Sequence, residues 1–204
     1  MSKKTALVTG AAAGIGRACA LRLANEGIRV GVLDLDLEGC EKVAAEIKDA
    51  GGEAIALQAS IADRPQVETA VEQLRNAFGP VTIVVNNAGI SNFIPFEDLT
   101  EADWDRMFEI NTKGTFIVTQ VVLPDMKAAN WGRIVNISSS SAQTGSVEHV
   151  HYSASKGAVI SMTRSLAQAL GPYGITVNNI PPGAVMGTIM AEANKDRFKM
   201  PMET

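Results

Sequence analysis

The sequence contains few cysteines, few aromatic residues and no excess of positive charge. Its two cysteines, Cys19 and Cys40, both fall in helical patterns, so we expect free thiols in a reducing cytoplasm rather than a disulfide. A net charge of −4 without a basic block argues against nucleic acid or an anionic membrane as the main partner. No apolar run approaches the roughly 18 residues of a membrane span, and the N-terminal segment lacks the pattern of a signal peptide.

Short apolar runs alternate with longer amphipathic segments along the 204 residues. We expect strands at 5–10, 29–35, 53–60, 81–89, 132–139 and 174–180. We expect helices at 14–26, 37–50, 63–78, 100–129 (bent or begun anew at Pro124) and 152–171. The strands are apolar on nearly every residue, as parallel strands covered on both faces must be. The pattern predicts a single α/β domain, 1–204, with a doubly wound parallel sheet and helices on both faces.

The first expected strand runs directly into a glycine-rich loop, TGAAAGIG, at residues 9–16. Glycines at 10, 14 and 16 permit a tight turn and let the backbone approach a pyrophosphate, which the next helix N-terminus attracts. The same letters also fit a plain tight turn, but the position between a strand and a helix favours a dinucleotide site.

Asp34 ends the second expected strand, twenty residues after Gly14. A carboxylate at this position can accept hydrogen bonds from both hydroxyls of an adenosine ribose and repels a 2′-phosphate. Neither Leu35 nor Ala13 supplies a cation that would neutralise such a phosphate, so we expect NAD rather than NADP. The alternative is that Asp34 only ends a strand in a turn.

Tyr152 and Lys156 stand four residues apart at the start of an expected helix and therefore share one face. A free phenol has a pKa of about 10, and a value near 7 needs about 4 kcal/mol of preference for the phenolate. We expect the Lys156 ammonium and the positive ring of bound NAD⁺ to supply it, so that Tyr152 acts as a base. The alternative is an ordinary pair of surface residues.

These features and four further motifs together resemble the short-chain dehydrogenase/reductase family along the whole chain. The matching motifs are TGAAAGIG (9–16), NNAG (86–89), Asn111 in EINTKGTF, GRIVNISS (132–139), YSASK (152–156) and PPGAV (181–185). Ser139 precedes Tyr152 by thirteen residues, which is the spacing of the family. The resemblance implies a Rossmann fold and an oxidoreductase that moves a hydride between NAD(H) and a secondary alcohol or ketone.

The resemblance also implies a role for each catalytic residue. Tyr152 takes the hydroxyl proton, Lys156 holds the nicotinamide ribose, and Ser139 stabilises charge on the substrate oxygen. Asn111 holds a water molecule that links Lys156 to solvent. Ser138 remains the rival of Ser139, and Asn111 could instead be only a helix-kink residue.

The same resemblance predicts the lining of the site. Cofactor contacts are expected from Gly10, Ala13, Gly14, Ile15, Gly16, Asp34, Leu35, Ser60, Ile61, Asn87, Ala88, Gly89, Tyr152, Lys156, Pro182, Gly183, Val185 and Thr188. Substrate contacts are expected from Ser91, Asn92, Phe93, Ser141, Gln143, His149, Met186 and Met190. We expect no metal, because neither His149 nor His151 has the company of other ligands.

The sequence departs from the family pattern at three places. Ser60 replaces an aspartate that usually contacts adenine, and Thr188 comes one residue later than the family's threonine. The chain stops at Thr204, whereas single-domain members run to roughly 250 residues, which is ordinary for one α/β domain. We therefore expect a truncated version of a longer protein that lacks a seventh strand, leaves the outer edge of 174–180 unpaired and is poorly ordered over 187–204.

The leading interpretation is a cytoplasmic NAD-dependent oxidoreductase acting on a small alcohol or ketone. It is expected to form a homodimer through helices 101–128 and 152–171, and a tetramer if a full C-terminus is present. The first alternative is a 3-oxoacyl-thioester reductase, which Asp34 disfavours because that role usually draws on NADPH. The second is a non-catalytic dinucleotide sensor, which the presence of all four catalytic residues disfavours.

Overall fold

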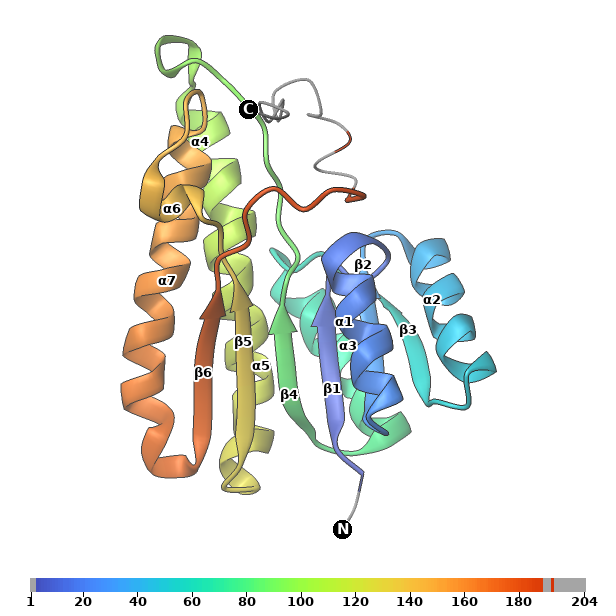
Figure 1. Cartoon of the computed structure of the whole chain (residues 1–204). Helices are drawn as coiled ribbons and strands as arrows, with labels where there is room; N and C mark the ends of the chain where they lie inside the picture. The colour runs from blue at the N-terminus through green and yellow to red at the C-terminus, as the bar shows by residue number, and fades with distance from the viewer. Residues whose placement is uncertain (1–2, 189–191, 193–204) are drawn as a thin grey trace, which may run out of the picture.

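Six parallel strands form one central sheet in the order β3-β2-β1-β4-β5-β6 (Figure 1). The computed structural model describes residues 3–188 and residue 192. The strands are β1 (Thr5–Thr9), β2 (Arg29–Asp34), β3 (Ala54–Gln58), β4 (Val81–Asn86), β5 (Gly132–Ile137) and β6 (Ile175–Ile180). All six expected strands are confirmed, and each is slightly shorter than its apolar run because the flanking residues turn out of the sheet.

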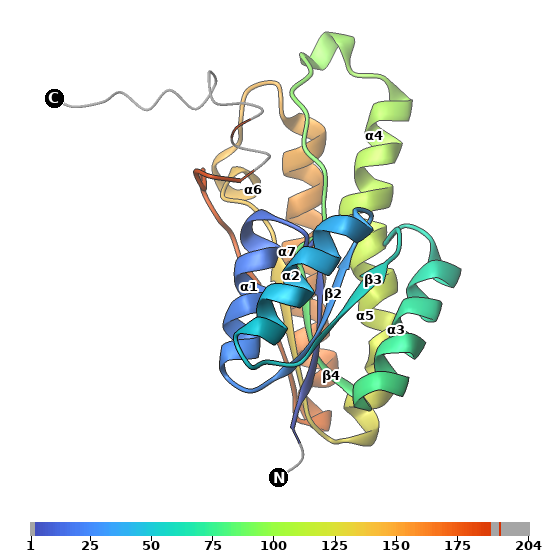
Figure 2. The same ribbon diagram turned by 90° about the vertical axis from the view of Figure 1, so that its right-hand side faces the viewer.

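Helices cover both faces of the sheet, and they pack on it through two separate apolar cores. The helices are α1 (Gly14–Asn25), α2 (Leu37–Asp49), α3 (Arg64–Phe78), α4 (Glu101–Phe108), α5 (Thr115–Ala128), α6 (Ser141–Thr144) and α7 (Val150–Leu170). Leu7 packs with residues of α3, α5 and α7, while its neighbour Val8 packs with α1 and α2. Figure 2 shows α1 and α3 on opposite sides of the strands. The single-domain α/β fold with a doubly wound sheet is therefore confirmed.

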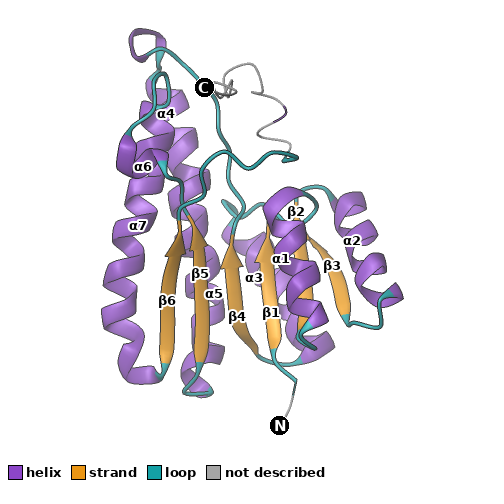
Figure 3. Ribbon diagram, in the orientation of Figure 1, coloured by secondary structure: helices purple, strands orange, loops and turns teal. Residues whose placement is uncertain are grey.

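The strand order reverses at β1, which lies between β2 and β4. Crevices that bind ligands in open α/β sheets form at this reversal, beyond the carboxyl ends of the strands. The loops that leave β1, β4, β5 and β6 gather at that end of the molecule (Figure 3). The fold thus brings the motifs that follow separate strands to one place.

The long helical region expected at 100–129 is the element that differs most from its prediction. It consists of α4, the π-helical segment η2 (Glu109–Gly114) and α5. Asn111 lies inside the π-helical segment, so the irregularity occurs at this residue. Pro124 lies within α5 and starts no new helix, contrary to one of the two roles expected for it. Two short 3₁₀ turns, η1 (Phe96–Asp98) and η3 (Gly171–Tyr173), and helix α6 were not predicted.

The outer strand β6 pairs only with β5 among the described residues. Ile175 and Val177 are buried, whereas Ile180 at the end of the strand is half exposed. The segment 187–204, expected to be poorly ordered, lies mainly outside the described residues. Met190, expected to contact substrate, also lies outside them. None of the described helices combines the length and the apolar character needed to cross a membrane.

Candidate active site

The glycine-rich loop after β1 approaches neighbouring backbone so closely that side chains do not fit. Gly10 and Gly14 have φ angles of +64° and +54°, which favour glycine. A Cβ atom on Gly16 would lie 2.1 Å from the Gly10 carbonyl oxygen. Helix α1 begins at Gly14 without a side-chain cap from Ala13. The first turn of α1 therefore offers its N–H groups to an anionic ligand.

The Asn87 side chain braces this loop from β4. Its Nδ2 donates to the carbonyl oxygens of Thr9 and Gly10, at 3.0 Å each. The Thr9 hydroxyl accepts from the backbone N–H groups of Asn87 and Ala88, at 3.1 Å each. The NNAG motif and the glycine loop therefore form one hydrogen-bonded unit across β1 and β4.

Asp34 stands at the carboxyl end of β2 with its carboxylate fixed by backbone donors. The N–H groups of Ala12, Leu35 and Asp36 donate to it at 3.2, 2.7 and 3.3 Å. Asp34 lines a cavity of about 550 Å³ that begins at the glycine loop and continues to Ser91. Among the described residues that line this cavity, Asp34 and Arg106 carry the only charges. The cavity, the glycine loop and the fixed Asp34 carboxylate together fit a dinucleotide.

A second cavity, of about 110 Å³, adjoins the first through Ile15, Asn87, Gly89 and Thr188. Of the eighteen residues expected to contact a cofactor, only Gly16 lines neither cavity, since it packs against Gly10 instead. The smaller cavity is lined by Ile15, Asn87, Gly89, Ile137, Ser138, Ser139, Tyr152, Lys156, Pro182, Gly183, Ala184, Val185 and Thr188.

Lys156 lies at the back of the smaller cavity and is only 4% exposed. Its Nζ donates to the Ile137 carbonyl oxygen at 3.0 Å. Burial lowers the pKa of Lys156 to about 8, because the low-dielectric surroundings disfavour the ammonium. The lysine thus remains mostly cationic at neutral pH, although its charge is far less stable than in water.

Asn111 is fully buried, and its amide holds the segment that follows the NNAG motif. Its Oδ1 accepts from Ile90 N at 2.8 Å, and its Nδ2 donates to Ile90 O at 3.0 Å and to Ser155 Oγ at 3.1 Å. A Cβ atom on Gly89 would lie 2.9 Å from Asn111 Oδ1 and 3.2 Å from Lys156 Nζ. Asn111 and Lys156 therefore converge on one glycine, and these bonds account for the break in the helix.

Tyr152 is 7% exposed, and its ring centroid lies 5.9 Å from Lys156 Nζ. Burial raises the pKa of Tyr152, and a hydrogen bond with Ser139 offsets part of this rise by lowering it. Desolvation of the phenolate therefore dominates in the protein alone. The decrease expected from the sequence concerns the complex, in which the positive ring of NAD⁺ acts together with Lys156.

Ser139 rather than Ser138 faces Tyr152. Ser139 Oγ hydrogen-bonds Ser141 Oγ at 2.9 Å and is the serine that acts on the phenol. The Ser138 hydroxyl instead donates to the Ile180 carbonyl oxygen at 3.4 Å, between β5 and β6. The serine chosen by spacing is therefore the one that hydrogen-bonds the phenol, although both serines line the smaller cavity.

The eight residues expected to line a substrate site are distributed unevenly. Ser91 lines the larger cavity, and His149 packs against the Tyr152 ring. Among the described residues Asn92, Phe93, Ser141, Gln143 and Met186 line neither cavity, and Met186 is 65% exposed.

Sequence reasoning missed Arg106 and Ile110, which both line the larger cavity from the helical region. Their spacing of four residues, just before Asn111, is the signal that could have identified them. Over the described part of the chain, no group of three or more histidine, cysteine, aspartate or glutamate side chains is arranged to hold a metal ion.

Comparisons with known proteins agree with this geometry. The family model described as short chain dehydrogenase matches residues 4–198. A 3-oxoacyl-[acyl-carrier-protein] reductase from Staphylococcus aureus is 39% identical over 98% of this chain and 82% of its own length. D-threitol dehydrogenase from Mycolicibacterium smegmatis is 39% identical over 90% of this chain and 70% of its own.

A solved structure of NAD⁺-bound xylitol dehydrogenase superposes with a TM-score of 0.86 and 38% identity. The match covers 90% of this chain and 71% of that one. The expected family is thereby confirmed. This chain belongs to the short-chain dehydrogenase family and is an oxidoreductase that works with a nicotinamide dinucleotide.

Proposed function

We propose that this protein oxidises a secondary alcohol, or reduces the matching ketone, with NAD(H) as its hydride carrier. The observation that carries the proposal is the Asp34 carboxylate, which three backbone N–H groups fix at the edge of the larger cavity. Because a 2′-phosphate beside it would meet like charge, NADP(H) binds weakly. The NAD⁺-bound xylitol dehydrogenase among the similar structures supports the same choice.

The catalytic step follows from the groups around the smaller cavity. Bound NAD⁺ supplies the acceptor for the hydride. Tyr152 Oη takes the hydroxyl proton of the alcohol, and the Ser139 hydroxyl donates to the substrate oxygen. Burial alone raises the Tyr152 pKa, and the Lys156 ammonium together with the positive charge of the oxidised cofactor would offset this rise by stabilising the phenolate.

The substrate class has two candidates. The D-threitol and xylitol dehydrogenases among the relatives support a polyol or similar small alcohol. The S. aureus 3-oxoacyl-[acyl-carrier-protein] reductase supports an acyl thioester instead. We favour the alcohol, because Asp34 is unsuited to the NADPH that a biosynthetic reductase usually uses. A non-catalytic sensor is disfavoured by the convergence of Lys156, Tyr152 and Ser139 on one cavity.

A substrate screen tests the proposal. Secondary alcohols and polyols are offered with NAD⁺ or NADP⁺, and 3-oxoacyl thioesters with NADH or NADPH, while the absorbance of the reduced cofactor is followed. We expect turnover of alcohols with NAD⁺ and little with NADP⁺. Efficient reduction of thioesters with NADPH and no turnover of alcohols would favour the other candidate.

We also propose a homodimer through residues 101–128 and 152–171. Phe116 on α5 is 45% exposed and borders a shallow hollow formed with Arg64, Pro65 and Lys113. An exposed aromatic ring beside charged groups is typical of an interface. Light scattering of the unaltered protein and of Phe116→Asp tests this, with a dimer expected for the first and a monomer for the second. A monomeric unaltered protein would contradict it. The expected tetramer depends on residues outside the described part of the chain.

A further inference from the structure

The proposed proton-transfer residue occupies a weak part of its helix. Tyr152 lies in the first turn of α7, and the N-cap residue His149 makes no side-chain hydrogen bond to that turn. First turns without a cap lose about 1 kcal/mol of stability and fray readily. A catalytic group must nevertheless be held within about 0.5 Å of its working position. Other contacts must therefore keep Tyr152 in place.

The segment 148–151 is fastened to the segment 91–94, which leaves β4 beyond the NNAG motif. The backbone N–H of Ile94 donates to the Glu148 carbonyl oxygen at 2.8 Å. Ser91 Oγ and His149 Nε2 form a hydrogen bond of 2.7 Å. Glu148 and His149, which lead into the start of α7, are thus both bonded to the segment 91–94.

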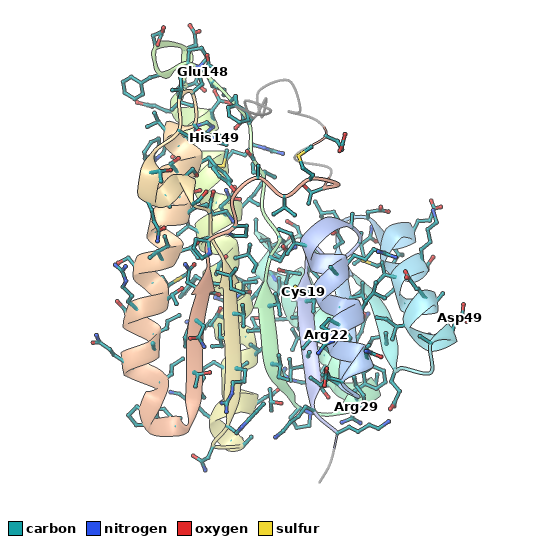
Figure 4. The ribbon with its side chains drawn as sticks, in the orientation of Figure 1. Cys19, Arg22, Arg29, Asp49, Glu148 and His149 are labelled. Atoms are coloured by element: carbon teal, nitrogen blue, oxygen red, sulfur yellow. The ribbon has the colours of Figure 1, made fainter. Side chains whose placement is uncertain are left out.

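His151 makes a further bond between the segments 148–151 and 91–94. It is fully buried, and its Nε2 donates to the Asn92 side-chain oxygen at 2.7 Å. The two histidines consequently contact the adjacent residues Ser91 and Asn92. Figure 4 places His149 and Glu148 above the carboxyl ends of the strands, at the same end as the cavities.

The imidazole of His149 also touches the phenol directly. Its ring stacks on Tyr152 with centroids 4.4 Å apart and planes 21° apart, and on Phe93 at 3.9 Å and 15°. The ring is therefore held between Phe93 and Tyr152, with its edge bound to Ser91. Aromatic stacks at this spacing add about 0.5–1.5 kcal/mol to simple burial.

We propose that His149, bonded to Ser91 and stacked on Tyr152, is a positioning residue that replaces the missing helix cap and sets the orientation of the phenol. This role rests on the proposed function of Tyr152. His149 does not need to touch the reacting atoms. The consequence is that the loop after β4 and the proton-transfer residue move as one unit.

Three variants separate the two contacts of His149. His149→Ala removes both the stack and the hydrogen bond, His149→Phe keeps a ring for the stack, and Ser91→Ala removes only the hydrogen-bond partner. Val147→Ala is the matched control, since Val147 is in the same loop and 85% exposed.

We expect turnover of His149→Ala to fall about 10- to 100-fold, as small misplacements of reacting groups do. His149→Phe and Ser91→Ala should each lose only about fivefold, the value of one hydrogen bond. The affinity for NADH, measured by fluorescence, should stay within about twofold in both His149 variants, because His149 lines neither cavity. Turnover of His149→Ala equal to that of Val147→Ala would overturn the proposal.

A second readout does not depend on activity. The chain has two tyrosines, Tyr152 and Tyr173, so Tyr173→Phe leaves Tyr152 as the only tyrosine for ¹³C NMR titration. In that background His149→Ala should shift the raised pKa of Tyr152 toward the free value, while Val147→Ala should not. If no alcohol is turned over, the proposed function fails, but the titration still tests whether His149 positions Tyr152. An unmoved Tyr152 pKa, with losses of NADH affinity and thermal midpoint instead, would reduce His149 to a general packing residue.

Discussion

The two halves of the sheet contribute different kinds of groups to the site. Around β1 and β2, the site consists of backbone: a glycine loop, an open helix N-terminus and one carboxylate held by N–H groups. Around β4, β5 and α7, it consists of buried side chains, namely Asn111, Tyr152 and Lys156. The first half is therefore sensitive to added atoms, and the second to changes in charge and solvation.

The difference follows from what each half must do. Close approach to a diphosphate requires the absence of Cβ atoms, and N–H donors need no ionisable group. Proton transfer requires groups whose pKa values depart from those in water, and burial is the means that changes them. Burial lowers the pKa of Lys156 and raises that of Tyr152, so in the protein alone it destabilises the charged form of each side chain relative to water.

The largest effect is expected from adding one methyl group in the backbone half. Gly16→Ala places a Cβ 2.1 Å from the Gly10 carbonyl oxygen, and backbone must move to relieve the clash. We expect NADH affinity to fall about 10- to 100-fold, since overpacking typically costs 1–3 kcal/mol. Fluorescence titration measures it. Gly157→Ala is the control, because a Cβ there meets nothing within 4 Å. Equal NADH affinities for Gly16→Ala and Gly157→Ala would contradict the claim that the half around β1 and β2 is sensitive to added atoms.

The next largest effect is expected from the buried Lys156, on the pH dependence of the free energy of unfolding. Between pH 8 and about 10 the unfolded chain keeps the proton of Lys156 while the folded protein releases it, so stability rises with pH in this window. Lys156→Met lacks this rise. The free energy of unfolding of the unaltered protein should gain up to about 3 kcal/mol relative to the variant. Urea unfolding at several pH values measures the gain, and parallel curves would contradict the burial of a charged lysine.

A smaller effect is expected when Asp34 and Leu35 are changed, on the preference for NAD⁺ over NADP⁺. Replacing Asp34 by Ala and Leu35 by Arg removes the repulsion of a 2′-phosphate and adds a partner for it. The preference for NAD⁺ over NADP⁺ in kcat/KM should narrow by at least about tenfold. Glu41→Gln, which removes an exposed charge outside both cavities, should leave it unchanged. A double variant with an unchanged preference would show that Asp34 does not select the cofactor.

The smallest effect concerns Arg106, the one cationic side chain among the described residues lining the larger cavity. Being exposed, it should contribute only about 1 kcal/mol or less to binding a diphosphate. Arg106→Ala should weaken NADH binding about two- to fivefold at low salt and less at high salt. Lys48→Ala, which removes an exposed cation of α2 that lines neither cavity, is the control. An effect independent of salt would argue against a charge contact.

The sequence predicts the backbone half well, because glycines at 10, 14 and 16 and Asp34 act through local geometry that spacing encodes. It also finds Tyr152 and Lys156, since residues four apart share a helix face. It does not predict the π-helical segment at Asn111, which depends on bonds to Ile90 and Ser155 from distant parts of the chain.

The sequence does not reveal how strongly burial raises the Tyr152 pKa in the protein alone, since the depth of burial is a property of the assembled fold. The decrease expected from Lys156 and bound NAD⁺ together remains a prediction for the complex. The sequence also does not predict that His149, expected to line the substrate site, stacks on Phe93 and Tyr152 and hydrogen-bonds Ser91, because these are tertiary contacts. Both features lie in the half of the site made of buried side chains.

The most direct test of the account is the turnover of Tyr152→Phe with NAD⁺ and an alcohol substrate, measured beside its affinity for NADH. Phenylalanine keeps the packing of the ring but cannot accept a proton. We predict that kcat falls about 10²- to 10⁴-fold, the usual loss for a general acid–base group, while the NADH affinity changes less than about twofold. A variant that keeps a tenth of the original rate would contradict the role of Tyr152.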